Sequence, residues 1–578
     1  MAGSAIVIGS GPGGSIAAWI LALAGWTVTI FEKGPNYFGD LTSASPSTQF
    51  SNDELKEARF FDNPDWEQAE PRTYYRQSDA QSGAPRATGF VNQLPTNVGG
   101  GTVHWDAKTP RFWDIDFKKL STPGLGPVTG ADVQDWPMTY SDLAPYYDAV
   151  ENLIGVQGDL SALQNAPTYT HHPQSAFAMP PGPGEYGSLK ASAAARTLGL
   201  HPFPTPMAIN STQHDGRPAC NNCGFCSGYG CPIHARVGAL APLRRAMQTG
   251  RVQLRANSFV SRVNWSNRRA TTVTYTDPNG KQSTQGCNLV VLAGSAMETA
   301  RLALLSGLPD PHGLIGRNLM FHWFTDAIGV FFGERIHANR GRSTTHDLED
   351  YADPDFPGAR AAAAANGLPY MRGGILEIGG TQELIAEGLT YQFLLQTLAP
   401  EKPFGASFKQ LMRASPLRDR LLGIQMIAED LAQPDNRVTL DPNLKDIYGQ
   451  PVARVTYSPH RHEQAAQRFY MPQLVAILKA AGADLAAGVP AVSTADFPVA
   501  QADAPSGAHI MGGMRTGTDP TISVCDPNGR VHDLDNVFVT DASLFATSGA
   551  VNPTLTLMSV ALRNAVAFSG LGTIPAIN

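Results

Sequence analysis

Four cysteines in one short segment are the most concentrated reactive group of the sequence. In "ACNNCGFCSGYGCP" (219–232) they are spaced by two, two and four residues, and a proline follows the last: Cys220, Cys223, Cys226 and Cys231. Such runs wrap iron–sulfur clusters in ferredoxins, although the ferredoxin run has one residue fewer before its final Cys-Pro. A four-cysteine zinc site is a second interpretation, and a loop of inert or disulfide-linked thiols is a third. The spacing leaves all three open.

A glycine-rich turn near the start of the chain suits a nucleotide. Gly9, Gly11 and Gly14 form the G-x-G-x-x-G pattern between an apolar stretch and an apolar helix. The first glycine permits the tight turn, the second lets backbone approach a pyrophosphate, and the third lets helix and strand pack. Glu32 ends the next apolar stretch, where an acidic side chain meets ribose hydroxyls. We predict a dinucleotide site, and this pattern does not separate FAD from NAD.

The elements that would position this turn are short apolar strands alternating with helices. We predict strands at Ala5–Ile8 and Val28–Phe31 with a helix from about Gly13 to Ala24 between them. "NLVVLAGSAMETARLALLS" (288–306) repeats strand, turn and helix, and "DNVFVTDASLF" (535–545) is a buried strand ending in a polar turn. Alternating elements at both ends of the chain predict a parallel sheet assembled from distant segments.

The middle of the chain has a different pattern. Longer antiparallel strands are predicted at 329–336, 389–398 and 422–431, and an amphipathic helix at 461–483. Residues 347–373, with several prolines and an alanine run, are predicted to be a loop or lid. These segments indicate a second domain inserted into the first.

Size and charge narrow the class of protein. The 578 residues exceed what one hydrophobic core usually holds, so two joined domains are expected. A net charge of −7 and the lack of a basic run argue against a nucleic-acid partner. The apolar N-terminal stretch lacks a basic flank and is interrupted by glycines, so we expect neither a signal peptide nor a membrane span there. A cytoplasmic location is expected, and a periplasmic one only through export with a partner.

Several motifs, in order, resemble one known family. "TNVGGGTVHWDAKTPRFW" (96–113) and "DWPMTYSDLAPYYDAVENLIGV" (135–156) are similar to segments of the glucose–methanol–choline (GMC) flavoprotein oxidoreductases. The likeness continues through 288–306, "IGRNLMFH" (315–322), "NRVTLDPNLKDIYGQPVARVTY" (436–457) and the last seventy residues. It implies FAD as the cofactor and oxidation of an alcohol to a carbonyl.

The fold expected from this resemblance is α/β (α+β overall). A Rossmann-like FAD-binding domain would carry an inserted substrate domain, built on an antiparallel β-sheet covered by helices. The boundaries follow the change of pattern along the chain. They give an FAD-binding domain of 1–155, 196–324 and 501–578 and a substrate-binding domain of 156–195 and 325–500.

The resemblance also implies residues that meet the cofactor. It places Val260 at the adenine, Asp541 at the pyrophosphate–ribityl region and the three glycines of the motif near the flavin, namely Gly99, Gly100 and Gly101. At the position of His104, sugar-oxidising members carry FAD covalently. The alternative is a histidine packed near the ring without a bond.

The catalytic residues are implied by the two C-terminal motifs. In "SGAHIMGGMR" (506–515) His509 corresponds to the base that takes the hydroxyl proton, and in "SGAVNPTLTLMS" (548–559) Asn552 corresponds to the partner that orients the hydroxyl. Many members have a second histidine in place of Asn552, whereas pyranose, cellobiose and sterol oxidising relatives have the His/Asn pair. The remaining histidines, including His322 and His234, are predicted to be structural.

The substrate and the electron acceptor are less constrained. A secondary hydroxyl of a sugar or glycoside is the first expectation, and an apolar long-chain or sterol-type alcohol is the alternative. The acceptor could be oxygen, a quinone or a partner subunit. If the cysteines hold a cluster, the chain would be the flavin subunit of an electron-transfer dehydrogenase with a small or cytochrome partner.

Overall fold

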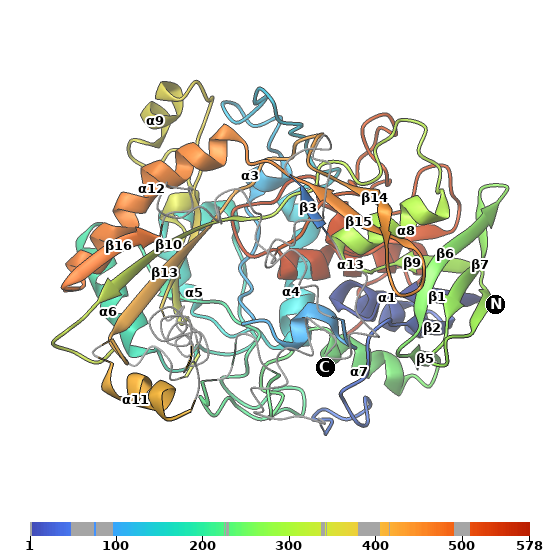
Figure 1. The fold of residues 1–578 in the computed structure, drawn as a ribbon, viewed down its shortest axis with the longest axis horizontal. Helices are drawn as coiled ribbons and strands as arrows, with labels where there is room; N and C mark the ends of the chain where they lie inside the picture. Colours follow the sequence, from blue (N-terminus) through green and yellow to red (C-terminus); the bar gives the residue numbers. More distant parts are fainter. Residues whose placement is uncertain are drawn as a thin grey trace.

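The computed structural model describes most of the chain. The described residues are 3–47, 74–76, 96–224, 226, 230–336, 341–342, 344–379, 401, 405–415, 417–489 and 509–577. Two β-sheets lie at opposite ends of the long axis of the molecule, and helices cover them (Figure 1). This mixed α/β architecture confirms the predicted fold class.

The first sheet is parallel and has the strand order β17-β9-β1-β2-β5. It joins segments from both ends of the sequence, as predicted, and lies on the right in Figure 1, near the label of the N-terminus. All of its strands are short, and all except β5 are mostly buried. The strands are β1 (Ser4–Ile8), β2 (Thr27–Phe31), β5 (Val252–Arg255), β9 (Leu289–Leu292) and β17 (Val537–Val539).

Helices pack beside this sheet. α1 (Pro12–Leu23) contacts both α7 (Leu240–Gln248) and α13 (Thr554–Ser569), and α13 also contacts α4 (Tyr140–Ile154). Nearly every residue of α1 is buried, which explains why its sequence is apolar on all sides. α13 thereby places the C-terminal motif next to the N-terminal glycine turn.

The second sheet is antiparallel, with the order β16-β10-β13-β12-β11-β4. α12 (Arg461–Ala480) packs on β10 and β16 and against α6 (Tyr186–Thr197), which matches the predicted amphipathic helix. The strands are β4 (Phe203–Pro204), β10 (Trp323–Val330), β11 (His346–Leu348), β12 (Gly374–Ile378), β13 (Leu421–Ala428) and β16 (Leu485–Val489).

Two three-stranded sheets complete the framework, and α8 (Ala296–Ser306) packs against strands of both. One sheet is formed by β6 (Phe259–Ser266), β7 (Arg269–Thr276) and β8 (Gln282–Gly286). The other is formed by β14 (Arg437–Lys445), β15 (Pro451–Thr456) and β3 (Tyr74–Arg76). Short elements connect the rest: α3 (Asp114–Phe117), α5 (Leu160–Gln164), α9 (Ala359–Ala365), α11 (Ala406–Ala414) and the single turns η4 (Gly100–Val103), η5 (Pro167–His171), η6 (Asp350–Ala352) and η7 (Ala542–Leu544).

Two predictions for the middle of the chain need correction. The strand expected at 329–336 is β10, which begins at Trp323 and ends at Val330, because burial alternates along those residues and Phe332 is exposed. The expected loop at 347–373 contains the turn η6 and helix α9, since its alanine run is a strong helix former. The strand expected at 389–398 lies outside the described residues.

The predicted domain boundaries stay predictions. β4 falls in the segment assigned to the FAD-binding domain, yet it forms the edge strand of the antiparallel sheet beside β11. That pairing ties the two predicted domains together through the backbone.

Candidate active site

A cavity of about 210 Å3 opens at the carboxyl ends of β1, β2 and β9. This edge of a parallel sheet is where α/β folds bind nucleotides. Most of the predicted cofactor residues line it, namely Gly9, Gly11, Glu32, Gly100, Gly101, Val260 and Asp541. Gly14, Gly99 and His104 are not among the residues that line it.

The glycine turn leaves room for a phosphate group. A Cβ atom on Gly14 would lie 2.1 Å from the backbone oxygen of Gly9, so this glycine lets helix and strand pack. A Cβ atom on Gly11 would meet nothing within 4 Å, which leaves open space over the start of α1. No side chain caps that helix end. The free N–H groups of the first turn can therefore bind an anion, and this cradle fits the pyrophosphate of FAD.

Glu32 is held in place by backbone and hydroxyl donors. The backbone N–H and the hydroxyl of Ser10 donate to Glu32 Oε2 over 3.0 and 2.7 Å, and the N–H of Gly34 donates to Oε1 over 2.9 Å. The Ser10 hydroxyl in turn accepts from the N–H of Gly99 over 3.1 Å. Glu32 thus links the nucleotide turn to the triple-glycine segment.

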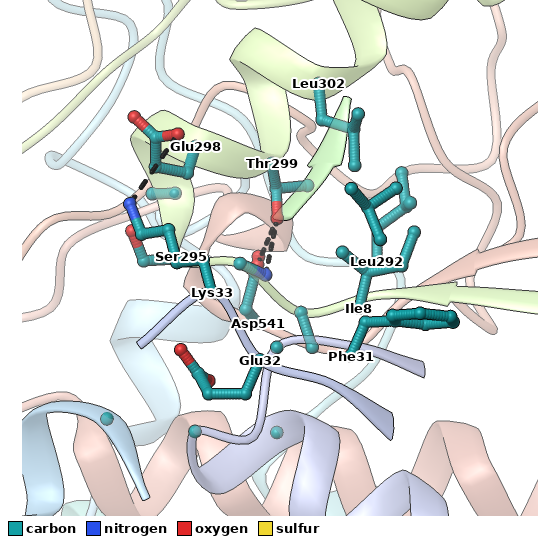
Figure 2. A pocket seen from close by; sticks show the side chains of 18 of the residues that line it. Ile8, Phe31, Glu32, Lys33, Leu292, Ser295, Glu298, Thr299, Leu302 and Asp541 are labelled. Carbon is teal, nitrogen blue, oxygen red and sulfur yellow. Dashed lines mark hydrogen bonds and ion pairs between the residues drawn. The ribbon is translucent and has the colours of Figure 1, made fainter. Parts of the chain in front are cut away.

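Asp541 faces the same cavity from the C-terminal part of the chain. Figure 2 shows the hydroxyl of Thr299 bonded to its carboxylate, and the N–H of Ser543 also donates to it over 3.0 Å. Burial raises the pKa of Asp541 despite these donors. Lys33 and Glu298 form an ion pair of 3.9 Å elsewhere on the cavity wall (Figure 2).

The triple-glycine segment carries His104 at its end. A Cβ atom on Gly100 would lie 3.1 Å from the Cα of Gly11, so the two glycine segments touch. His104 follows η4 directly. Burial, together with the charge of Arg236, lowers the pKa of His104 to about 3, so its imidazole is neutral.

His509 lies directly before Ile510, which lines the cavity. Met320 and Met511 exchange two backbone hydrogen bonds as an antiparallel bridge, and the same register brings His322 opposite His509. The two Nδ1 atoms of this histidine pair lie 2.8 Å apart, and the ring of Phe324 stands edge-on to His509 at 5.6 Å. His509 itself has a φ of +59°, an unfavourable value for a side chain of this size.

Both imidazoles of the pair are neutral near pH 7. Burial lowers the pKa of His322 to about 4. Burial also lowers the pKa of His509 well below its usual value, and the neighbouring His322 and Lys108 add to the effect. A neutral imidazole is the form that can accept a proton.

Asn552, just before α13, is buried and points to a charged group. Its amide donates to Glu377 Oε1 over 3.0 Å, and Glu377 is paired with Lys108. Lys108 is also 2.6 Å from Asp106, and these two carboxylates raise the pKa of Lys108 against the opposing effect of burial. Oδ1 of Asn552 has no hydrogen-bond partner among the described residues. Because Lys108 acts on both His509 and Glu377, it connects the surroundings of the two predicted catalytic residues.

Three residues of this site were not identified from the sequence. His322 was assigned to structure, and Lys108 and Glu377 were not singled out. A signal existed for two of them. Glu377 is a charge in the otherwise apolar strand "GILEI", and Lys108 is a charge in a buried segment four residues after His104. A buried charge usually needs a partner, which is the reason to look for one.

The four thiols of the cysteine segment lie at different depths. All six cysteines are free, so the disulfide interpretation is wrong. Burial raises the pKa of Cys226 to about 12 and also raises that of Cys220, while Cys223 is exposed. Within the described ranges, no three His, Cys, Asp or Glu side chains gather closely enough to hold a metal. The iron–sulfur and zinc interpretations of these thiols stay predictions.

Comparisons with known proteins identify the family of this chain. Family models described as "GMC oxidoreductase" match residues 192–324 and 432–561, and one described as "NAD(P)-binding Rossmann-like domain" matches residues 7–61. The 6'''-hydroxyparomomycin C oxidase of Streptomyces lividus is 30% identical over 502 residues, covering 82% of this chain and 79% of the relative. The chain belongs to the GMC oxidoreductase family, and FAD is its cofactor.

Other relatives extend over nearly the whole chain. The 2-methyl-1,2-propanediol dehydrogenase of Mycolicibacterium austroafricanum is 29% identical, covering 96% of this chain and 93% of the relative. The fructose dehydrogenase large subunit of Gluconobacter japonicus is 28% identical, covering 97% of this chain and 96% of the relative. A variant formate oxidase from Aspergillus oryzae has the same fold, with a TM-score of 0.64, 15% identity and 98% coverage of both chains.

Among the helices that the structure describes, none is both long and apolar enough to cross a membrane.

Proposed function

We propose that the protein oxidises a hydroxyl group of a sugar or glycoside to a carbonyl. The observation that carries this choice is the charged group behind Asn552. Lys108, Glu377 and Asp106 form a polar wall in this proposal: they are joined by ion pairs, Glu377 accepts from Asn552, and the group would recognise a substrate with several hydroxyl groups. An apolar long-chain or sterol-type alcohol would offer such a wall no further hydrogen bonds and would remove water from it, at a cost in binding free energy.

His509 acts as the base in this proposal and Asn552 as the orienting group. FAD, when bound, supplies a two-electron acceptor for the hydride. Neutral His509 takes the proton of the hydroxyl group, so the alcohol loses one hydride and one proton and becomes a carbonyl. Asn552 cannot take a proton and holds the hydroxyl oxygen in position, which lowers the entropic part of the barrier. The relatives support the substrate class, since one is named a fructose dehydrogenase large subunit and another a 6'''-hydroxyparomomycin C oxidase.

His104 is the proposed position of covalent attachment to the flavin. Its imidazole is neutral, the form that can act as a nucleophile, and it follows the triple-glycine segment beside the cavity. Acid precipitation tests this directly: the yellow colour should stay with the protein and be released in His104→Ala. A colourless precipitate of the wild type would contradict covalent attachment.

A second candidate concerns the electron acceptor. Because one relative is the large subunit of a fructose dehydrogenase, we propose that this chain passes its electrons to a partner subunit or a quinone rather than to oxygen. This proposal does not depend on a metal at the thiols of the cysteine segment. A cytoplasmic location remains our prediction and is tested by cell fractionation.

One experiment tests the substrate class and the acceptor together. The holoenzyme is mixed without oxygen with sugars, glycosides, vicinal diols and long-chain alcohols, and loss of the flavin absorbance is followed. Sugars or glycosides should bleach the flavin fastest. Bleaching by long-chain alcohols alone would contradict the proposed substrate. Addition of oxygen, a quinone or an artificial dye then shows which acceptor restores the colour.

A further inference from the structure

A second histidine contacts the proposed base. The rings of His322 and His509 stand nearly perpendicular, at 89° and 4.9 Å between centroids, with 2.8 Å between their Nδ1 atoms. A hydrogen bond of this length requires one protonated and one unprotonated nitrogen. Two neutral imidazoles can satisfy it in two ways, which differ in the tautomer of His509.

The other partner of His322 decides between them. Nε2 of His322 lies 3.0 Å from the backbone oxygen of Ser548, and a carbonyl oxygen can only accept. Nε2 of His322 must therefore carry its proton. Since burial lowers the pKa of this side chain to about 4, it has a single proton near pH 7, and its Nδ1 holds a free electron pair. Nδ1 of His509 must then be the donor.

We propose that His322 is a positioning residue that fixes His509 in the tautomer with its proton on Nδ1 and a free electron pair on Nε2. The inference rests on the proposed role of His509 as the base and names the atom that acts. The hydroxyl proton moves to Nε2 of His509, the O–H bond breaks, and the hydride leaves the carbon for the bound acceptor. The Nδ1 proton stays in place throughout.

His322 would also stabilise the product of this proton transfer. Once protonated, His509 is a cation whose Nδ1–H still points at the electron pair of His322, and hydrogen bonds to charged groups are stronger than neutral ones. His322 is itself well fixed, being 2% exposed and held by Ser548 and by the backbone register of Met320 and Met511. It can hold His509 at the strained φ of +59°.

Two substitutions separate this role from a packing role. His322→Asn keeps an acceptor oxygen close to the position of Nδ1, whereas His322→Leu keeps volume and removes the acceptor. His460 provides the matched control, because its Nε2 donates to the oxygen of Thr129 over 2.9 Å and its Nδ1 accepts from the N–H of His462 over 3.1 Å. His460→Leu therefore removes a histidine with the same kinds of backbone partner, and no described interaction joins it to His509.

The measurement is the rate constant for flavin reduction by saturating substrate, with FAD content as the check on folding. His322→Leu should be slower by about 10- to 100-fold with little change in KM, since a hydrogen bond to a charged group is lost. His322→Asn should recover to within a few-fold of wild type, and His460→Leu should match it. A fully loaded His322→Leu with the wild-type rate would overturn the inference, as would a loaded His322→Asn as slow as the leucine variant.

The same data distinguish failure of this inference from failure of the proposed function. His509→Ala is measured alongside. If it loses flavin reduction while His322→Leu does not, the base stands and the positioning role is wrong. If His509→Ala reduces flavin at the wild-type rate, the proposed base itself is wrong.

A spectroscopic measurement covers the case in which the His322 variants do not fold. Nitrogen-15 NMR of ring-labelled histidines in the wild-type holoenzyme reports which ring nitrogen carries the proton, and His509→Ala assigns the signal. The expected spectrum has a protonated Nδ1 and an unprotonated Nε2 for His509. The opposite tautomer would overturn the inference.

Discussion

The two predicted catalytic residues have opposite kinds of support. His509 is hydrogen-bonded to the neutral imidazole of His322, which is hydrogen-bonded in turn to the backbone oxygen of Ser548. These two hydrogen bonds involve no formally charged group. Asn552 is backed by Glu377, Lys108 and Asp106, all ionisable. His322, Lys108 and Glu377 are buried and Asp106 is partly exposed, but only the group behind Asn552 contains charges that pair with one another.

The difference matches what each residue is proposed to do. A base must stay neutral until it takes a proton, and burial, with the nearby His322 and Lys108, keeps the pKa of His509 low. An orienting amide must keep one direction, and a carboxylate that accepts its N–H fixes which end of the amide faces away. A neutral hydrogen-bond partner therefore suits the proton transfer proposed for His509, and a group of paired charges suits the orienting role proposed for Asn552.

The largest effect, a loss of stability, is expected when the charged group behind Asn552 loses Lys108. Lys108→Met leaves Glu377 and Asp106 without their counter-charge, and breaking a buried pair in this way costs about 3–5 kcal/mol of unfolding free energy. Thermal unfolding should show a clear drop in midpoint. Lys190→Met is the control, because its pair with Glu334 is partly exposed to solvent and is worth at most about 1 kcal/mol. Equal midpoints for the two variants would show that the buried charges do not support the fold.

Removal of the orienting amide should come next. Asn552→Ala should retain FAD and reduce it about 100-fold more slowly, because one oriented hydrogen bond to the reacting oxygen is lost. Rapid mixing with substrate under anaerobic conditions measures this rate constant. An alanine variant as fast as the wild type would remove Asn552 from the proposed mechanism.

A smaller effect on catalytic efficiency is expected from Glu377, the hydrogen-bond partner of Asn552. Glu377→Gln can still accept from the Asn552 amide but loses its charge, so we expect a decrease of about 10-fold in kcat/KM, equivalent to about 1.4 kcal/mol. The loss should appear mainly in KM if the polar wall binds substrate hydroxyls. If instead kcat falls as much as in Asn552→Ala, Glu377 takes part in the reaction rather than in orientation.

The sequence predicted the parts of the site that depend on local pattern. The glycine turn, Glu32 and the strands around them follow from spacing and from apolar runs, which local backbone chemistry decides. Family motifs indicated His509 and Asn552 as catalytic candidates. Their supports could not be predicted in this way, because His322 and His509 are 187 residues apart and meet only through a bridge between distant segments.

The cysteine segment is a case in which a local pattern does not determine the arrangement of side chains. Its spacing is compatible with a metal cluster, but spacing does not determine how the thiols of Cys220, Cys223 and Cys226 point. The structure leaves them free and at different depths. Side-chain direction in an irregular loop depends on packing that no local pattern encodes.

The central claim is that a neutral His509 takes the substrate proton, and the pH dependence of flavin reduction tests it most directly. Burial lowers the pKa of His509 well below the usual imidazole value, so the active neutral form persists as the pH falls through that value. The wild-type rate constant should stay level through about pH 6.5 and decrease only at lower pH. His509→Ala should be slower by about 1,000-fold or more and lack this acid decrease. A half-maximal rate at or above pH 6.5, or flavin reduction by His509→Ala at the wild-type rate, would contradict the account.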